Sequence, residues 1–322
     1  MHRRSVLAGR WAIAIGVMTV SAMIGSASDA HVQDASGGAG AAASAQAMGV
    51  VQSVLKASAS CREPELFGPG VFSTDKWEWR LAFTPNGRTA YWSVSDTFFP
   101  ITGESTMVTS RFEGGTWTPP EVVPFSGTYG DIDPFITLDG RTMFFSSNRP
   151  VNGESRKADL WMVTRTRSGA WGEPVHLGPE VNSAGDDLYP SVDIRGTLYF
   201  GSDRGGEFDI WRSRRRADGT YGPPENVGPG VNSSTHWEYN PLISPDGHLL
   251  LFASLNRPGG YGFGDVYASA LWNGRFTTAV NLGPCVNTFA DEYHPVFSPD
   301  FRSLFFVRTW DRPGDFYRLR LW

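Results

Sequence analysis

Five acidic residues recur along the chain at a nearly constant spacing, and each precedes a short apolar run. They are Glu78, Asp131, Asp187, Glu238 and Glu292, which follow one another at intervals of 53, 56, 51 and 54 residues. Carboxylates gathered from distant segments can hold a cation, bind sugar hydroxyls or a basic peptide, or cleave a glycosidic bond as a pair. They can also accept backbone N–H groups and so complete the start of a strand. Recurrence in all five units favours this structural role.

The position two residues after each acid differs from unit to unit. It holds Arg80, Asp133, Tyr189, Asn240 and His294. A residue needed only for packing would tend to repeat, whereas a shared site needs unlike groups converging from each unit. Unconstrained variation at an exposed rim is the alternative.

The position before each acid adds flat aromatic surfaces at two places, Trp77 and Trp237. Aromatic faces of this kind pack against sugar rings or aromatic side chains. The sequence therefore predicts one shared ligand site, made by the following residues: Trp77, Glu78, Arg80, Asp131, Asp133, Asp187, Tyr189, Trp237, Glu238, Asn240, Glu292 and His294.

Catalysis would use a subset of these residues. Asp131 or Asp133 with Glu238 would form the carboxylate pair of a glycoside hydrolase or lyase, and His294 or Arg80 would orient the substrate. Other chemistry has no support in the sequence, since no nucleophile-elbow, zinc-protease, Walker or dinucleotide motif is present. The histidines show no metal-ligand spacing, so we predict no metal site and no cofactor, while an acidic ring could accommodate a cation such as calcium.

Composition indicates the elements that must position these residues. Of 322 residues, 40% are hydrophobic and 13% aromatic, and the chain contains 37 Gly, 22 Pro and 12 Trp. Short strands joined by turns fit this composition better than helices. The formal charge of -5, without a basic stripe, argues against nucleic acid as a partner.

A repeat of about fifty residues organises the strands. Turns such as "SPDG" (244–247) join an inner strand to an apolar second strand, and a third and a fourth strand follow. This period with strands throughout predicts a five-bladed β-propeller of four-stranded blades within residues 61–322. The expected blades are 75–128, 129–183, 184–233, 234–288 and 289–322, the last completed by an N-terminal strand within 64–73.

The units resemble the WD40-like repeat of the TolB type. The resemblance rests on the prolines at 134, 190, 241 and 295, on "SNR" (147–149) and "SDR" (202–204), and on "DIW" (209–211). It covers about the last 250 residues, and its five units differ from the six blades of TolB itself. The resemblance implies a propeller and the roles its relatives serve, which are periplasmic binding scaffold, peptidase gating domain and polysaccharide-degrading enzyme.

Two structural links and the cysteines give further expectations. Arg149, Arg204, Arg257 and Arg312 should pair with the third-strand acids Asp159, Asp209, Asp265 and Asp315. The V-N-S and V-N-T turns at Asn182, Asn232 and Asn287 should stabilise strand ends. Cys61 and Cys285 should stay unpaired, because strand direction places them toward opposite faces.

The N-terminus predicts export. Residues 1–30 carry Arg3, Arg4 and Arg10 before an apolar run, which is typical of a signal peptide read by the general secretory or the twin-arginine route. Its removal takes away three Arg and one Asp and gives a formal charge of -5 - 3 + 1 = -7. Residues 31–60 are rich in Ala and Gly and should form a flexible segment.

Three functions follow from these features. The leading one is a periplasmic or secreted monomeric scaffold, without a membrane span after signal cleavage, that binds a polysaccharide or a protein at the channel rim. A glycan-active enzyme is the first alternative. An assembly factor like TolB is the second.

Overall fold

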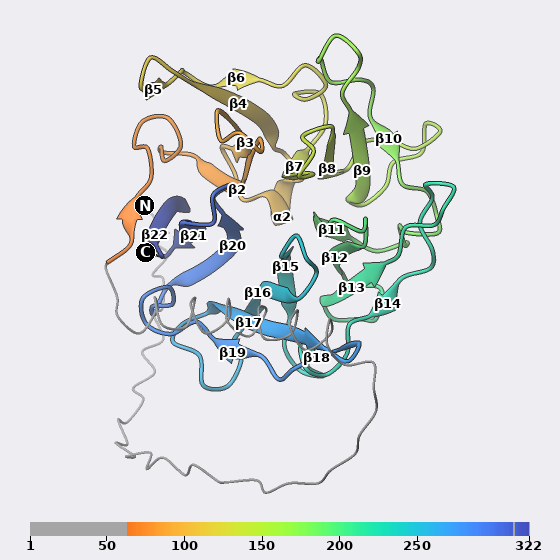
Figure 1. The fold of residues 1–322 in the computed structure, drawn as a ribbon, viewed down its shortest axis with the longest axis vertical. Coiled ribbons are helices and arrows are strands. Elements are labelled where there is room, and N and C mark those ends of the chain that lie inside the picture. The colour runs from red at the N-terminus through yellow and green to blue at the C-terminus, as the bar shows by residue number, and fades with distance from the viewer. Residues whose placement is uncertain (1–62, 312, 322) are drawn as a thin grey trace, which may run out of the picture. The chain divides into compact units, whose positions relative to one another are not determined.

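The computed structural model of the chain describes residues 63–311 and 313–321. The predicted signal peptide and the Ala/Gly-rich segment therefore lie outside the described residues, as do Cys61 and Arg312. Five antiparallel sheets surround one axis, which confirms the predicted five-bladed propeller (Figure 1). Among the described residues, no helix is long and apolar enough to span a membrane.

Each blade runs outward from an inner strand at the axis. Blade 1 contains β2 (Trp77–Phe83), β3 (Thr89–Ser95), the short helix α2 (Phe99–Thr102), β4 (Thr106–Glu113), β5 (Thr116–Trp117) and β6 (Glu121–Val122). Blade 2 contains β7 (Asp131–Ile136), β8 (Thr142–Ser147), β9 (Asp159–Thr164) and β10 (Val175–His176). Blade 3 contains β11 (Asp187–Val192), β12 (Leu198–Ser202), β13 (Asp209–Ser213) and β14 (Glu225–Asn226).

The last two blades complete the ring. Blade 4 contains β15 (Glu238–Ile243), β16 (Leu249–Leu255), β17 (Gly264–Trp272), β18 (Arg275–Phe276) and β19 (Val280–Asn281). Blade 5 contains β20 (Asp291–Phe297), β21 (Ser303–Thr309), β22 (Asp315–Arg320) and β1 (Glu65–Leu66). The outermost strand of blade 5 is thus β1, as predicted, and it pairs Leu66 with Tyr317 of β22.

Aromatic side chains of the second strands fill the core between blades. Phe145, Phe200, Phe252 and Phe306 occupy equivalent positions and are fully buried. Each second strand also packs against the inner strand of the neighbouring blade, so the face it turns toward that blade needs apolar residues. This explains why these strands are almost wholly apolar in sequence.

The inner strands of blades 2 to 5 carry a bulge at an X-Pro pair. In β7 the register shifts between Ile132 and Phe135, which leaves Asp133 and Pro134 outside the ladder. Proline has no N–H to donate, so a bulge accommodates it inside an otherwise regular sheet. The residue before proline takes a left-handed φ in all four blades: Asp133 (60°), Tyr189 (64°), Asn240 (51°) and His294 (51°). In blade 1 the inner strand also shifts register, but Leu81 replaces the proline and Arg80 does not adopt a positive φ.

Strand direction defines two faces of the propeller. Inner strands begin where second strands end and third strands begin, as the partners Asp131–Ser147 and Ser147–Asp159 show. We call this the entry face, and we call the opposite face, where inner strands end, the exit face.

The prediction of two unpaired cysteines is wrong for Cys285. This residue is buried and disulfide-bonded, and Cys61 lies outside the described residues. Cys285 lies in the turn after β19, and not within a strand, so strand direction alone does not determine which cysteine it can reach.

Candidate binding site at the propeller axis

The five acids of the inner strands serve mainly as structural ties. All five are fully buried. Four of them accept a backbone N–H from the segment that leads in from the preceding blade, at Thr74, Ser183, Ser233 and Thr288. This is the structural role that their recurrence favoured.

In blades 2 to 5 an arginine after or within the second strand neutralises the acid. The closest N···O distances are 2.5 Å for Arg149–Asp131, 2.5 Å for Arg204–Asp187, 3.7 Å for Arg257–Glu238 and 2.7 Å for Arg308–Glu292. In three of these blades the same guanidinium donates to a valine carbonyl of the linking segment, at Val181, Val231 and Val286. Each arginine therefore joins its blade to the previous one.

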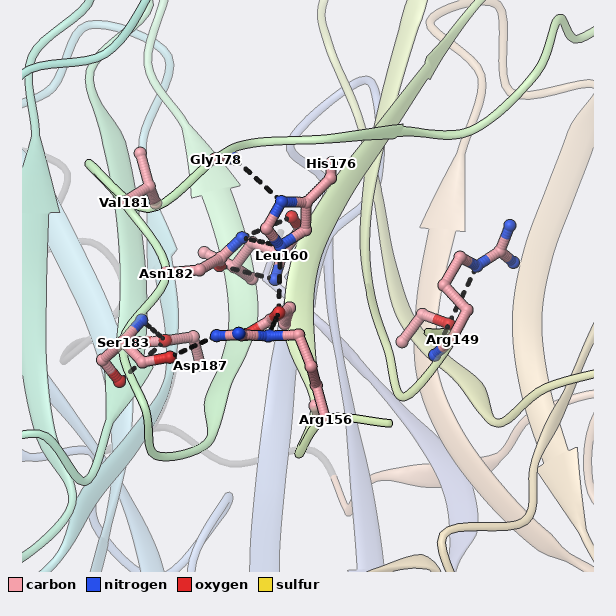
Figure 2. A network of polar contacts seen from close by, with 12 residues as sticks. Arg149, Arg156, Leu160, His176, Gly178, Val181, Asn182, Ser183 and Asp187 are labelled. Carbon is pink, nitrogen blue, oxygen red and sulfur yellow. Dashed lines mark hydrogen bonds and ion pairs between the residues drawn. The ribbon is translucent and has the colours of Figure 1, made fainter. Parts of the chain in front are cut away.

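The predicted pairing with third-strand acids is wrong for Arg149, Arg204 and Arg257, and the predicted pairing of Arg312 with Asp315 lies outside the described residues. Figure 2 shows the partners of the third strand in blade 2, where His176 of β10 bonds Asp159 at 2.9 Å. In blades 3 and 4 an asparagine of the fourth strand takes this place, with Asn226 bonded to Asp209 and Asn281 to Asp265. The inner-strand acid lies closer to the arginine and is more deeply buried, which gives a charge-assisted bond its larger effect. In blade 5, Arg308 pairs with the inner-strand acid Glu292, as Arg149, Arg204 and Arg257 do with theirs.

The asparagines of the V-N-S and V-N-T turns hold the third strand, as predicted. Asn182 accepts from the Leu160 N–H at 2.8 Å and donates to the Leu160 carbonyl at 3.1 Å (Figure 2). Asn232 and Asn287 repeat this pair of bonds with Ile210 and Val266. The turn thereby fixes the end of each blade to its own third strand.

Glu78 is the one inner-strand acid for which the described residues provide no arginine. Asp96 stands where Arg149 stands in blade 2, and it pairs with Lys76 at the surface. Thr74 donates to one carboxylate oxygen of Glu78 through its N–H and its hydroxyl, at 2.9 and 2.5 Å. Burial, together with the nearby Asp315, raises the pKa of Glu78 to about 8.

The five variable residues converge at the axis. Nε2 of His294 lies 3.5 Å from Oδ1 of Asp133, and the backbone N–H of His294 donates to Asn240 at 3.2 Å. The rings of Tyr189 and His294 have centroids 5.8 Å apart. Arg80 acts on both Asp133 and His294 electrostatically. The convergence expected of a shared site is thus present.

Variation at an exposed rim does not fit, because this cluster is buried. Arg80, Asp133, Asn240 and His294 are each at most 2% exposed. We call Arg80, Asp133, Tyr189, Asn240 and His294 the axial cluster.

Burial controls the charges of the axial cluster. It raises the pKa of Asp133 to about 7, an effect that Arg80 opposes. Burial and the neighbouring Arg80 hold the pKa of His294 well below 6.5. Arg80 keeps its charge at neutral pH, since burial lowers its pKa only to about 10. At neutral pH the cluster thus combines a cationic guanidinium, a neutral imidazole and a carboxyl group close to its midpoint.

Several polar atoms of the axial cluster have no hydrogen-bond partner among the described residues. They include both carboxyl oxygens of Asp133, Nη1 of Arg80, Nδ2 of Asn240 and Nδ1 of His294. Buried polar atoms without partners cost about 1–3 kcal/mol each, so their concentration in one place marks a site with capacity for a polar ligand.

The sequence interpretation missed Gly201 in β12. A Cβ atom at this position would lie 2.9 Å from Cδ2 of Tyr189, so the glycine admits the tyrosine ring beside the axis. A glycine inside a strand that is otherwise apolar is the signal that could have revealed this close approach.

Exposed aromatic side chains gather at the entry face. Phe98, Tyr129, Trp237, Tyr261, Phe263, Phe289 and Trp310 are all at least 38% exposed, and all lie in connections that end at this face. Among the described residues, the exposed aromatics at the exit face are Phe112, Trp272 and Phe301. The ring centroids of Phe289 and Trp310 are 4.9 Å apart, and those of Phe263 and Trp310 are 6.2 Å apart. We call Phe263, Phe289 and Trp310 the aromatic patch.

The two tryptophans predicted to contact a ligand differ in solvent exposure. Trp237 is 45% exposed, whereas Trp77 is half-buried and packs on Trp79 and Phe98. Phe98 itself is 38% exposed. Trp237 can therefore contact a ligand with more of its surface than Trp77 can.

The residues of the predicted carboxylate pair are buried, and two of them are bound by arginines. Asp131, Asp133 and Glu238 are all 0% exposed, and Arg149 and Arg257 hold Asp131 and Glu238. Among the described residues, no group of three or more His, Cys, Asp or Glu side chains is arranged to hold a metal ion.

Comparison with known proteins bears on the fold. No protein-family model and no curated protein matches the chain. TolB from Acinetobacter baumannii is similar in structure at 17% sequence identity and a TM-score of 0.47, over 76% of this chain and 54% of that one. The chain thus spans about half the length of that TolB.

Two further solved structures belong to enzymes. The endo-arabinase from Bacteroides thetaiotaomicron VPI-5482 shares 12% identity and a TM-score of 0.53, over 79% of this chain and 95% of that one. The gluconolactonase XC5397 from Xanthomonas campestris shares 12% identity and a TM-score of 0.46, over 81% and 95%. At such identities the likeness concerns the fold alone. The chain is a five-bladed β-propeller with a TolB-like repeat.

Proposed function

We propose that the protein is an exported binding propeller that recognises a polysaccharide or a protein partner at its entry face. The observation that supports this most is the gathering of exposed aromatic side chains on that face. Trp310 is 57%, Phe289 66% and Phe263 54% exposed, and the Trp310 ring lies beside each of the two phenylalanine rings. Aromatic surfaces of this kind, left open to solvent, mark binding sites more often than they serve folding.

Export is part of the proposal and rests on the sequence of residues 1–30. An oxidising compartment also suits a chain in which Cys285 is disulfide-bonded. TolB-like propellers include periplasmic proteins, which agrees with this location.

A glycan-active enzyme is the less supported alternative. It needs two carboxyl groups that reach a substrate, and the candidates Asp131, Asp133 and Glu238 are all buried. Arginines bind Asp131 and Glu238. Glu238→Gln tests this directly, because it removes a catalytic charge but keeps the shape of the side chain.

The proposal can be tested by affinity electrophoresis in gels that contain arabinan, xylan, laminarin or alginate. Trp310→Ala should reduce the retardation by a polysaccharide that binds at the entry face, and Trp272→Ala, at a residue 49% exposed on the exit face, should not. A parallel reducing-sugar assay compares the wild type with Glu238→Gln. Turnover by the wild type that is lost in Glu238→Gln would replace the binding proposal by the enzyme.

A further inference from the structure

The turns at the exit face carry an apolar residue at the same place in every blade. The second residue of each turn between the first and the second strand is Pro85, Leu138, Ile194, Pro245 or Pro299. Proline suits this place in a turn through its fixed φ, but leucine and isoleucine have no such reason to be there. Leu138 is nevertheless 51% exposed and Ile194 73% exposed.

Neighbouring turns are in contact around the axis. The N–H of Ile194 donates to the Pro245 carbonyl at 2.8 Å. A Cβ atom at Gly140 would lie 3.2 Å from Cδ of Pro85. The residues of these turns that border one mostly apolar pocket of about 140 Å³, at the ends of the five inner strands, include Pro85, Leu138, Pro245, Pro299 and Phe301. We call these five residues and Ile194 the apolar ring.

Arginines surround the apolar ring. The segments that make the exit face are 84–88, 111–116, 137–141, 164–170, 193–197, 214–220, 244–248, 270–275, 298–302 and 320–321. They contain twelve Arg and six Asp or Glu, a formal charge of 12 - 6 = +6. The whole chain carries -5, so all its other residues together carry -5 - 6 = -11. The exit face is thus the basic side of an acidic protein.

Several of these arginines are available to a partner. Arg214, Arg216 and Arg320 have acids of nearby strands and turns within 4 Å. Five others are exposed and make no side-chain hydrogen bond or ion pair within the described part of the chain: Arg88, Arg141, Arg167, Arg275 and Arg302. Asp139 and Asp300 act on two of these five only electrostatically.

We propose that the protein docks through its exit face onto an anionic lipid bilayer. The apolar ring enters the boundary between headgroups and acyl chains, and the arginines around it donate to lipid phosphates. Trp272, 49% exposed in an outer turn of the same face, adds an aromatic ring of the kind that favours the headgroup region.

The combination of charge and apolar surface favours a bilayer over a soluble polyanion. An acidic polysaccharide would use the arginines but leave Leu138 and Ile194 in water. A bilayer offers phosphates and acyl chains side by side, so it satisfies both parts of the face. This proposal concerns the exit face and does not depend on what the entry face binds.

Flotation of the exported protein with vesicles of phosphatidylglycerol or of phosphatidylcholine tests the proposal. Binding to the anionic vesicles should be at least about tenfold tighter, because several arginines meet the charged surface together. Added salt should weaken this binding, since it screens exposed charges.

Charge reversals at the two faces are matched variants. Arg88→Glu combined with Arg302→Glu should weaken binding to phosphatidylglycerol at least about tenfold. Lys76→Glu combined with Lys157→Glu makes the same change in net charge at the entry face and should alter the binding by less than about twofold.

Apolar variants test insertion into the bilayer. Leu138→Ser combined with Ile194→Ser should weaken the binding several-fold, because both side chains are exposed and leave water only on docking. Trp310→Ala at the entry face should leave it unchanged, so failure here and failure at the entry face are separate results.

Equal binding to the two lipids, or no binding to either, overturns the proposal, and so do equal losses from the two pairs of charge reversals. Wild-type binding by Leu138→Ser with Ile194→Ser overturns it as well and indicates a soluble polyanion, such as alginate, as the partner. Circular dichroism checks that each variant is folded. If Arg88→Glu with Arg302→Glu does not fold, Arg141→Glu with Arg275→Glu provides the same comparison.

Discussion

At the scale of single residues, a buried inner-strand acid without a described arginine partner is what distinguishes blade 1. Four inner-strand acids have an arginine, while Glu78 depends on Thr74 and carries a pKa raised to about 8. A carboxyl group with a folded pKa above its unfolded value binds more protons in the folded state. Between about pH 4.5 and 8 it therefore makes the free energy of unfolding decrease as the pH rises.

Replacement of Glu78 by Gln should remove this effect. Gln imitates the protonated form, so Glu78→Gln should raise the free energy of unfolding by about 1–3 kcal/mol at pH 8.5 and change it little at pH 4.5. Urea unfolding across this range measures both values. Asp133 and Asp291, with pKa values raised to about 7 and about 6, should still make the free energy of unfolding of the variant depend on pH. A variant less stable than the wild type at pH 8.5 would show that Glu78 is needed in its ionised form.

Residue types alone predict part of the axial cluster. The five unlike polar side chains were recognised from their repeat positions, and they do converge. Their burial was not predictable, because it depends on how closely the inner strands approach, which Gly201 and the X-Pro bulges determine. The pocket where the five inner strands end was not predicted either, since its lining consists mostly of apolar residues that look like ordinary core in each blade.

At the scale of elements, side chains rather than long ladders fix the outer strands. The fourth strands have only two paired residues in most blades, as in β10 and β14. Asn232 compensates for this by bonding both the N–H and the carbonyl of Ile210 in the third strand. Its amide also bonds Asn226 of β14 at 2.8 Å.

Asn232→Ala should therefore be costly. It leaves the buried N–H of Ile210 without a partner, while the Ile210 carbonyl keeps the Val227 N–H at 3.2 Å, and we expect a loss of about 1–3 kcal/mol in the free energy of unfolding. Asn226→Ala, at an exposed position, should cost about 1 kcal/mol or less. Equal losses for the two variants in chemical denaturation would contradict the role assigned to the turn.

The arginine links show why the partner of a repeating charge is difficult to predict. Sequence distance made Asp159 and its equivalents the nearer acids for the arginines. The fold instead brings the inner-strand acids opposite the end of the second strand, as in the Asp187–Ser202 pair two residues before Arg204. Pairing across the ladder, and not proximity along the chain, therefore determines which acid each arginine binds. A sequence pattern does not show which residues lie opposite each other in a ladder.

At the scale of the whole molecule, the N-terminal segment closes the ring. β1 completes blade 5, and Phe72 then packs against blade 1, with its ring centroid 4.6 Å from that of Trp92 and 5.1 Å from that of Trp117. Ser73 adds two bonds to Phe316, since its hydroxyl donates to the carbonyl at 3.4 Å and accepts from the N–H at 3.1 Å. A single segment thus joins the last blade to the first.

Phe72→Ala should weaken the entire propeller. The side chain is 0% exposed, so its loss should cost about 3–5 kcal/mol and lower the temperature of one cooperative transition. Phe112→Ala, 41% exposed in blade 1, is the control and should cost about 1 kcal/mol or less. Differential scanning calorimetry measures the transition temperature of each variant. A Phe72→Ala transition within 1 °C of the wild type would show that closure of the ring contributes little to stability.

Site-specific photocrosslinking in the producing cells tests the proposed entry-face recognition most directly. p-Benzoylphenylalanine would replace Phe289, 66% exposed in the aromatic patch, or Trp272, 49% exposed at the exit face. The binding proposal predicts a discrete protein or glycan adduct from position 289 and none from position 272. The same adducts from both positions, or none from 289 while the protein is folded and exported, would contradict it.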